Sequence, residues 1–235
     1  MSVTISVIIP VFNEGTGTKI LVRDLTTNNG FNEIIVVDAS TDDASKAYLA
    51  ELAAQWHGTG SAVYYTGDRG RARQMNFGSA RATSDILLFL HADTVLPVGA
   101  IAVIDDAAQA GALWGRFDVR LDADDWWFRI IETAMNYRSA LTGIATGDQA
   151  IFVRRDLFES VGGYADIALM EDIDISRRLK RVAPPVRIRE AVMTSARRWH
   201  DGGVFATVIN MWILRLLFWV GVSPARLERW YGNAR

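Results

Sequence analysis

Three short apolar runs, each followed at once by polar residues, constrain the fold of this chain more than any other feature. They are Ile5 to Pro10, Glu33 to Asp38 (EIIVVD) and Asp85 to Leu90 (DILLFL). Short apolar runs rich in β-branched side chains are typical of strands that are buried on both faces. The sequence therefore predicts strands of a parallel sheet that is covered by helices on both sides.

Helical patterns separate these strands, and the order of elements becomes mixed after Gly99. The expected fold is α/β, a Rossmann-like mixed sheet with helices on both faces and a C-terminal helical extension. The expected helices are Gly17 to Thr27, Thr41 to Trp56, Arg71 to Ala82 and a long helix near Asp125 to Leu141, and the further strands are Ala62 to Thr66, Trp114 to Leu121 and Gln149 to Arg154.

The size and composition favour one compact domain. Half of the 235 residues are hydrophobic, which suits one packed core over residues 1–203, with an extension over 204–235. The formal net charge of -2 gives no general attraction for polyanions, so nucleic acid is not an expected partner. The lack of cysteine leaves oxygen and imidazole as metal ligands. No secretion signal is recognised at the N-terminus, which predicts a cytoplasmic protein.

The segment Val204 to Val222 is apolar on all sides and approaches the roughly 20 residues needed to cross a bilayer. Asn210 and Arg215 interrupt it, and a central arginine costs about 2.5 to 3.5 kcal/mol on insertion. We therefore expect a helix that rests on a membrane surface, at its inner face, or that is buried in a protein interface such as a homo-oligomer. A last short helix is expected after Ser223 and Pro224.

The polar residues that follow the predicted strands form the candidate binding site, because ligands bind at the carboxyl ends of parallel strands. Asp93 lies on a tight turn, where a carboxylate can hold Mg²⁺ or Mn²⁺ together with phosphate oxygens. Asp38 ends EIIVVD and can accept hydrogen bonds from a base or a ribose. Taken singly, each carboxylate is explained at least as well as a cap of its own turn.

Taken together, these motifs resemble the donor half of the family 2 glycosyltransferases, which use the GT-A fold. The resemblance rests on SVIIPVFNE ending at Glu14, DASTDD beginning at Asp38, HAD ending at Asp93, and RGRARQMN beginning at Arg69. It extends over about residues 3–200, with a donor half to about residue 98 and an acceptor half over 99–203, and suggests the subgroup associated with radical-SAM and selenodomain proteins. The family commonly has Asp where this chain has His91, which leaves Asp93 as the more dependable metal ligand.

The resemblance implies a site for a nucleoside-diphosphate sugar, with a UDP-sugar as the expected donor. Pro10, Phe12 and Glu14 would line the nucleoside pocket. Arg69 and Arg71 would lie near the diphosphate, since guanidinium groups match phosphate oxygens, although arginines that open a helix are often only solvated. The expected nucleotide-sugar-binding residues are Pro10, Phe12, Asn13, Glu14, Asp38, Ser40, Asp42, Arg69, Arg71, Gln74, His91, Ala92, Asp93, Arg198 and Trp199.

The resemblance also implies a divalent cation, Mn²⁺ or Mg²⁺, which would act as a Lewis acid on the leaving diphosphate. Asp93 and His200 are the expected ligands, with a purely structural histidine as an equal alternative for His200. Arg198 and Trp199 would close over the diphosphate and the acceptor; a packed aromatic residue beside an extended arginine is the alternative.

Acidic residues open the expected helix Ile173 to Val182, and helix dipoles alone commonly explain such residues. In the family, however, a Glu-Asp pair at this place provides the catalytic base, which corresponds to Glu171 and Asp172. Asp172 would take the proton of an unknown acceptor hydroxyl as its oxygen displaces the diphosphate, and the anomeric configuration would invert. The expected acceptor-side residues, for which ordinary turn and core packing is the alternative, are Trp114, Gly147, Asp148 and Gln149.

Two other functions stay open at this point. A nucleotidyltransferase would share the nucleotide pocket and the cation but would not need a base at Asp172. A catalytically silent nucleotide-sugar-binding or membrane-associated scaffold would need the pocket alone. A dehydrogenase and a phosphate-loop NTPase are excluded, because the chain lacks the spaced glycine fingerprint and a Gly-Lys-Ser/Thr motif.

Overall fold

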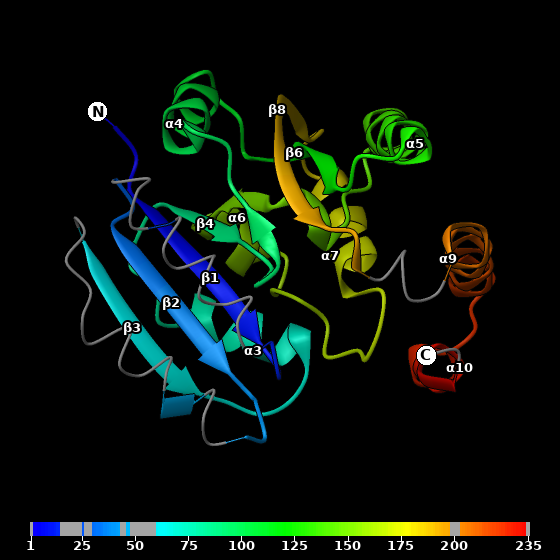
Figure 1. The fold of residues 1–235 in the computed structure, drawn as a ribbon. Coiled ribbons are helices and arrows are strands. Elements are labelled where there is room, and N and C mark those ends of the chain that lie inside the picture. Colours follow the sequence, from blue (N-terminus) through cyan, green and yellow to red (C-terminus); the bar gives the residue numbers. More distant parts are fainter. Residues whose placement is uncertain are drawn as a thin grey trace.

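The fold is an eight-stranded mixed sheet, seen in a computed structural model that describes residues 2–14, 25, 30–42, 46–47, 60–197 and 203–233 (Figure 1). The strand order is β3-β2-β1-β4-β7-β6-β8-β5. The strands are β1 (Ile5–Val11), β2 (Glu33–Asp38), β3 (Ser61–Thr66), β4 (Ile86–Phe89), β5 (Thr94–Val95), β6 (Trp114–Asp122), β7 (Ile151–Arg154) and β8 (Val186–Ser195).

The first four strands form the parallel part of the sheet. β1 pairs in parallel with both β2 and β4, and β2 pairs in parallel with β3. Val11 lies opposite Asp38, so the carboxyl ends of β1 and β2 meet at one edge of the sheet. β7 then joins antiparallel to β4, and β6 continues the sheet. The predicted parallel sheet in the donor half is confirmed.

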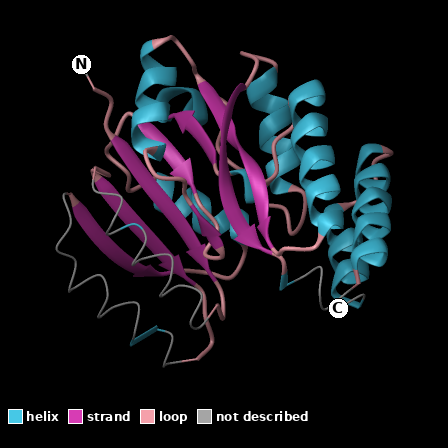
Figure 2. Cartoon of the chain, turned by 45° about the horizontal axis from the view of Figure 1, so that its top comes forward, coloured by secondary structure: helices cyan, strands magenta, loops and turns pink. Residues whose placement is uncertain are grey.

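Alternate residues of β1 enter two separate cores, one on each face of the sheet. Val7 and Ile9 pack in the core that α4 (Ala100–Gln109) covers, whereas Ile8 packs in the core of the opposite face. Figure 2 shows the sheet between its helices. The helices that cover the second face are α3 (Arg71–Ser79), α6 (Arg155–Ser160) and α7 (Glu171–Lys180).

The structure contains elements that the sequence pattern did not predict, namely β5 at the end of the donor half and α4, α6 and β8 in the second half. β8 pairs in parallel with β6, but the register shifts between Phe117 and Asp118, so that Ile188 and Ala191 take consecutive partners. This irregularity breaks the alternation of apolar residues that would mark a strand. The predicted long helix is confirmed as α5 (Trp126–Thr142), and α7 begins two residues earlier than predicted. The helices expected at 17–27 and 41–56 fall almost entirely outside the described residues.

Two C-terminal helices end the chain, α9 (Val204–Trp219) and α10 (Pro224–Asn233). In Figure 1 α9 lies next to α5, and α10 lies on the far side of α9. Leu214 and Leu227 pack with Met170, which directly precedes α7. Val208 packs against the small core beneath α5. In the part of the chain that the structure describes, neither these helices nor any other is long and apolar enough to cross a membrane. The C-terminal segment is therefore packed onto the domain.

Candidate active site

A cavity of about 340 Å³ lies at the carboxyl ends of the parallel strands. Its wall combines residues from the loop after β1, the start of α3, the end of β4 and the start of α7. This is the place at which open α/β sheets bind ligands. The predicted site residues that line it are Pro10, Phe12, Glu14, Arg69, Arg71, Gln74, His91, Asp148, Glu171 and Asp172.

The loops after β1 and β2 are tied together by side-chain hydrogen bonds. The Asn13 backbone N–H donates to Ser40 Oγ at 2.8 Å, and the Thr41 N–H donates to Asn13 Oδ1 at 3.0 Å. The Asp38 carboxylate accepts from the Ser40 N–H at 2.8 Å and from the Tyr64 hydroxyl at 2.9 Å. Asp38 is 1% exposed. It therefore holds the turn that carries Ser40 and does not line the cavity.

Gln74 and Phe12 show how α3 is joined to the strand ends. The Gln74 side-chain amide donates to the carbonyls of Val11 and Val37, at 2.7 and 2.8 Å. It thereby fastens α3 to the last residues of two parallel strands. The Arg69 guanidinium lies over the Phe12 ring, 4.5 Å from its centre, which is a cation–π contact.

Arg71 lies among the acidic residues of the cleft. Its Nη1 is 3.6 Å from Glu171 Oε1, and half of its side chain is exposed. Desolvation lowers the pKa of Arg71, but the carboxylates of Glu171, Asp148, Asp172 and Asp93 outweigh it and raise the pKa. Four acidic residues from three segments of the chain therefore surround the Arg71 guanidinium. Of the two arginines assigned to the diphosphate, Arg71 is the one placed at the centre of the site.

Asp172 is oriented by backbone groups from two segments. The Gly147 N–H donates to Asp172 Oδ2 at 3.0 Å, and the Ile173 N–H donates to Oδ1 at 2.7 Å. Gly147 opens the short 3-10 turn η1 (Gly147–Gln149). A Cβ at this glycine would lie 2.3 Å from the His91 ring, so only glycine allows the ring and the turn to touch. His91 Nδ1 in turn lies 3.5 Å from Asp148 Oδ1.

Glu171, the neighbour of Asp172, is buried. Desolvation raises the pKa of Glu171, and the nearby charge of Asp172 raises it further, while Arg71 opposes both. The two adjacent carboxyl groups therefore have different surroundings. Glu171 faces Arg71, whereas Asp172 is held by N–H groups at the cavity wall.

Backbone strain is concentrated around the site. Among the described residues, Asn13, Ala150 and Met170 are the non-glycine residues with positive φ, at 54°, 46° and 71°. Asn13 lies in the loop after β1, Ala150 directly after η1, and Met170 directly before Glu171. Such a conformation costs roughly 1–2 kcal/mol per residue and is found where the surrounding structure fixes a functional geometry.

Asp93, the predicted metal ligand, follows His91 by two residues but is not among the residues that line the cavity. It is half-buried, and its Oδ1 accepts only a long hydrogen bond, 3.3 Å, from Thr94 Oγ1 among the described residues. No group of three or more acidic residues and histidines in the described ranges could enclose a metal ion. Mg²⁺ and Mn²⁺ bound with nucleotides use only one or two protein carboxylates, so this arrangement suits such a cation.

Arg198, Trp199 and His200 lie outside the described residues, but the chain just before them is placed at the site. Arg197 pairs with Glu14 at 3.3 Å, and the Ser195 N–H donates to the Asp93 carbonyl at 3.2 Å. The described residues that precede Arg198 therefore lie beside the loop after β1 and beside Asp93, the predicted metal ligand.

Some predicted site residues belong to the protein interior. Trp114 is fully buried, and its indole N–H donates to the Ala183 carbonyl at 2.7 Å, so it cannot contact an acceptor. Gln149 is also fully buried and forms a capping box with Thr146. Ala92 packs in the core beneath α4. The side chains of these three residues lie in the interior, a placement that a short sequence motif does not reveal. Asp42 is exposed and lies outside the cavity wall.

The C-terminal helices contribute residues that the sequence reasoning did not assign to the site. Met211, Leu214 and Arg215 from α9, and Glu228 from α10, line the cavity. The signal was present in the sequence as a single arginine inside an otherwise uncharged helix. A charge in such a segment is costly and commonly has a function.

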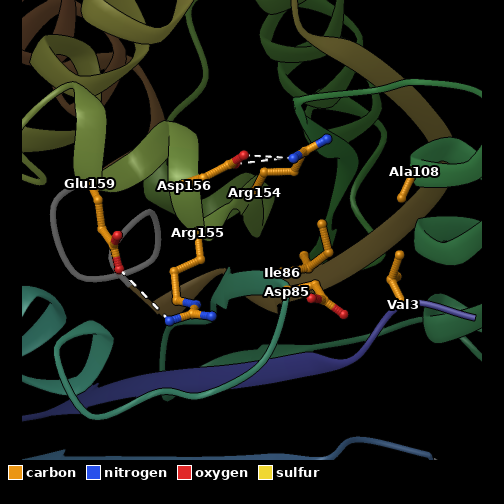
Figure 3. Close-up of a pocket in the computed structure, with 8 residues that line it drawn as sticks. All are labelled: Val3, Asp85, Ile86, Ala108, Arg154, Arg155, Asp156 and Glu159. Carbon is orange, nitrogen blue, oxygen red and sulfur yellow. Dashed lines mark hydrogen bonds and ion pairs between the residues drawn. The ribbon is translucent and has the colours of Figure 1, made fainter.

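A second cavity, of about 410 Å³, lies at the opposite end of β4 (Figure 3). Its charged residues are already paired: Arg154 with Asp156 at 2.6 Å, and Arg155 with Glu159 at 4.0 Å. Figure 3 shows these pairs turned toward each other. The paired charges, and the position away from the carboxyl ends of the parallel strands, favour the first cavity as the active site.

Comparison with known families identifies the chain. The model of glycosyl transferase family 2 matches residues 6–162. The chain belongs to glycosyl transferase family 2. The matched region begins in β1 and ends after α6, so it contains the loops after β1 and β2 and the η1 turn. The predicted subgroup associated with radical-SAM and selenodomain proteins stays a prediction.

Relatives of this family 2 chain include an uncharacterized glycosyltransferase of Mycobacterium tuberculosis, 30% identical over 200 residues, covering 79% of this chain and 72% of the relative. A beta-monoglucosyldiacylglycerol synthase of Trichormus variabilis is 26% identical over 229 residues, covering 84% of this chain and 47% of that protein. The chain thus spans about half the length of that synthase.

Solved structures support the GT-A fold. GalNAc-T7 with UDP, GalNAc and Mn²⁺ superposes with a TM-score of 0.64 at 16% identity, over 83% of this chain and 44% of that one. A mannosyltransferase of Pyrobaculum calidifontis in complex with GDP-Man and Mn²⁺ gives 0.61 at 19%, over 89% and 65%. At this identity the likeness shows the fold, which confirms the predicted fold class.

Proposed function

We propose that this family 2 chain transfers a sugar from a nucleoside-diphosphate sugar to an acceptor hydroxyl with inversion at the anomeric carbon. The observation that carries the proposal is the convergence of the donor loops, Arg71 and Asp172 on one cavity at the carboxyl ends of the strands. Two of the similar structures hold nucleotide or nucleotide-sugar together with Mn²⁺, which agrees with this donor class and with a UDP- or GDP-sugar.

The donor would bind along the ends of β1 and β2, with its diphosphate toward Arg71. Phe12 and Glu14 line this part of the cavity and offer a ring face and a carboxylate to a nucleoside. Asp93, together with His200, would hold the divalent cation. When bound, the cation neutralises charge on the diphosphate as the glycosidic bond breaks.

Asp172 would act as the general base. Both of its oxygens are oriented by backbone N–H groups, so the carboxylate is fixed in place before an acceptor arrives. The acceptor hydroxyl gives its proton to Asp172 while its oxygen forms a bond to the anomeric carbon, and the diphosphate leaves from the opposite face. Gly147 and Asp148 would form the acceptor side beside His91.

We further propose that α9 rests on a lipid surface. The apolar residues Ile209, Trp212, Leu216 and Trp219 recur on one face of this helix, and each is more than half exposed. The neighbouring α5 exposes Trp126, Ile130, Tyr137 and Leu141. Tryptophan and tyrosine favour the boundary between lipid and water. The name of the diacylglycerol synthase relative agrees with work at a membrane, where the acceptor would be found.

The test of the function is incubation of the purified chain with UDP-, GDP- and dTDP-sugars, with and without Mn²⁺. Cation-dependent release of sugar, or its transfer to added acceptors, supports the proposal. Release of pyrophosphate from a nucleoside triphosphate would support a nucleotidyltransferase in its place. Binding of a nucleotide sugar without turnover under all conditions would support the silent scaffold.

A further inference from the structure

Two arginines, one on α5 and one on α9, lie at the wall of the active-site cavity or just behind it; Arg138 falls inside the region matched by the family and Arg215 beyond it. Arg215, on α9, lines the cavity. Arg138, on α5, is close enough to Arg215 for the two positive charges to repel each other. The two helices pack together through Val208 and the residues beneath α5.

Both guanidinium groups carry buried N–H groups without partners. Nε and Nη2 of Arg138, and Nε of Arg215, are shielded from solvent and donate no hydrogen bond to any described residue. Buried donors of charged groups that stay unpaired are expensive, and folded proteins seldom keep them. Three of the seven such atoms among the described residues belong to these two neighbouring arginines, so the unpartnered donors are concentrated beside the cavity.

The electrostatic surroundings agree with an anionic ligand. Desolvation lowers the pKa of Arg138 to about 10, and the charge of Arg215 contributes to this shift. Desolvation also lowers the pKa of Arg215. Asp172 and Asp148 partly compensate both shifts. The arginines therefore lie near the proposed base, yet the Nε of each donates no hydrogen bond to any described residue.

The position of Arg215 has no explanation in the packing of α9. It is the single charged residue between Val204 and Trp219, and its neighbour Leu214 packs into the apolar contact with Met170. An aliphatic residue would serve that packing without the cost of burying a charge.

We propose that Arg138 and Arg215 bind an anionic group of the phosphate class carried by the acceptor, whose hydroxyl lies at Asp172. The inference rests on the proposed function, because it places the acceptor on the Asp172 side of the cavity. Paired guanidinium groups match phosphate oxygens in geometry and charge. The donor diphosphate is met by Arg71 from α3, so the cavity holds two separate sites for anions.

The test uses the purified full chain, with inorganic phosphate as the first probe and UDP or GDP with Mn²⁺ as the second, each followed by calorimetry. In the double variant Arg138→Gln, Arg215→Gln the affinity for phosphate falls by at least about tenfold, as expected for the loss of charged hydrogen bonds. The affinity for the nucleoside diphosphate stays within about twofold. Arg177→Gln, an exposed arginine of α7, is the matched control and changes neither affinity.

Phosphate binding that is absent from the unmodified chain, or equal in the double variant, overturns the proposal. A parallel loss of affinity for the nucleoside diphosphate assigns the arginines to the donor and overturns it as well. If neither UDP nor GDP binds while phosphate binding depends on the two arginines, the proposed function fails and the anion site stands.

A second variant separates a ligand site from a structural role. The substitution Arg215→Leu removes a desolvated cation from an apolar helix. The Tm of this variant in phosphate-free buffer is therefore equal to or higher than the Tm of the unmodified chain. Added phosphate raises the Tm of the unmodified chain and leaves that of the variant unchanged. A large drop in Tm of the variant without phosphate shows a structural arginine and overturns the proposal.

Discussion

The donor half, up to about residue 98, and the remainder of the chain build their parts of the site in different ways. In the donor half the site residues lie close to the end of a parallel strand or in the first turn of a helix, as Phe12 and Arg71 do. In the second half Asp172 depends on a hydrogen bond from Gly147, 25 residues away, and Arg215 reaches the cavity from the C-terminal helix. Local motifs specify the first part, whereas long-range packing specifies the second.

This difference predicts that substitutions in the two halves damage separate steps. Donor-half substitutions should act on the binding of cation and nucleotide, and second-half substitutions on transfer and on acceptor recognition.

The largest effect is expected for Asp172→Asn. The amide retains an oxygen that can accept a backbone hydrogen bond, so the fold persists, but it cannot take a proton. Transfer should fall by about 10²–10⁴-fold with unchanged affinity for the donor nucleotide. Steady-state rates and calorimetry measure the two quantities. Asp174→Asn, in the same helical turn and paired with Arg178, is the control, and normal turnover of the Asp172 variant would remove this residue from the mechanism.

Asp93→Ala should impair binding of the donor nucleotide, the quantity that Asp172→Asn leaves unchanged. The substitution would remove the carboxylate that we propose as the cation's protein ligand, so the Mn²⁺-dependent part of nucleoside-diphosphate binding should disappear. Calorimetry with and without Mn²⁺ measures this part. Asp106→Ala, an exposed carboxylate of α4, should leave it intact. An unchanged Mn²⁺ dependence in the Asp93 variant would contradict the assignment.

Gly147→Ala tests the contact between the halves. The added methyl group would meet the His91 ring at 2.3 Å, so the turn that holds Asp172 must shift. We expect a loss of about 1–3 kcal/mol in the free energy of unfolding, together with a lower transfer rate. Denaturant unfolding measures the change in the free energy of unfolding. The double variant with His91→Ala removes the clash and should recover part of the stability; the absence of any recovery would show that the ring is not the obstacle.

A smaller effect is expected at the surface of α9. Trp212→Ser with Trp219→Ser removes two exposed aromatic rings and should weaken binding to vesicles by about tenfold, without loss of stability. Co-sedimentation with vesicles of phosphatidylglycerol and phosphatidylcholine measures this. Val98→Ser, an exposed apolar residue outside both helices, is the control. A change from dimer to monomer in light scattering, with no vesicle binding by the unmodified chain, would show that α9 is an interface between copies.

The sequence alone predicted much of the donor half, because its strands are continuous apolar runs and its site residues follow them directly. It failed where exposure or distant pairing decides the role of a residue. Trp114 and Gln149 were predicted to be acceptor-side residues, but their side chains are buried in the interior. β8 was not recognised, because the register shift opposite Phe117 interrupts its pattern. The place of Arg215 depends on how α9 folds back, which no local motif encodes.

The measurement that tests the central claim most directly is a crystal structure of the chain with Mn²⁺ and a nucleoside-diphosphate sugar. We expect the cation on Asp93, the diphosphate beside Arg71, and the anomeric carbon facing Asp172. There should be room for an acceptor oxygen roughly 3–3.5 Å from the anomeric carbon. A nucleotide bound elsewhere, such as in the cavity beside Arg154 and Arg155, or a sugar turned away from Asp172, would contradict it.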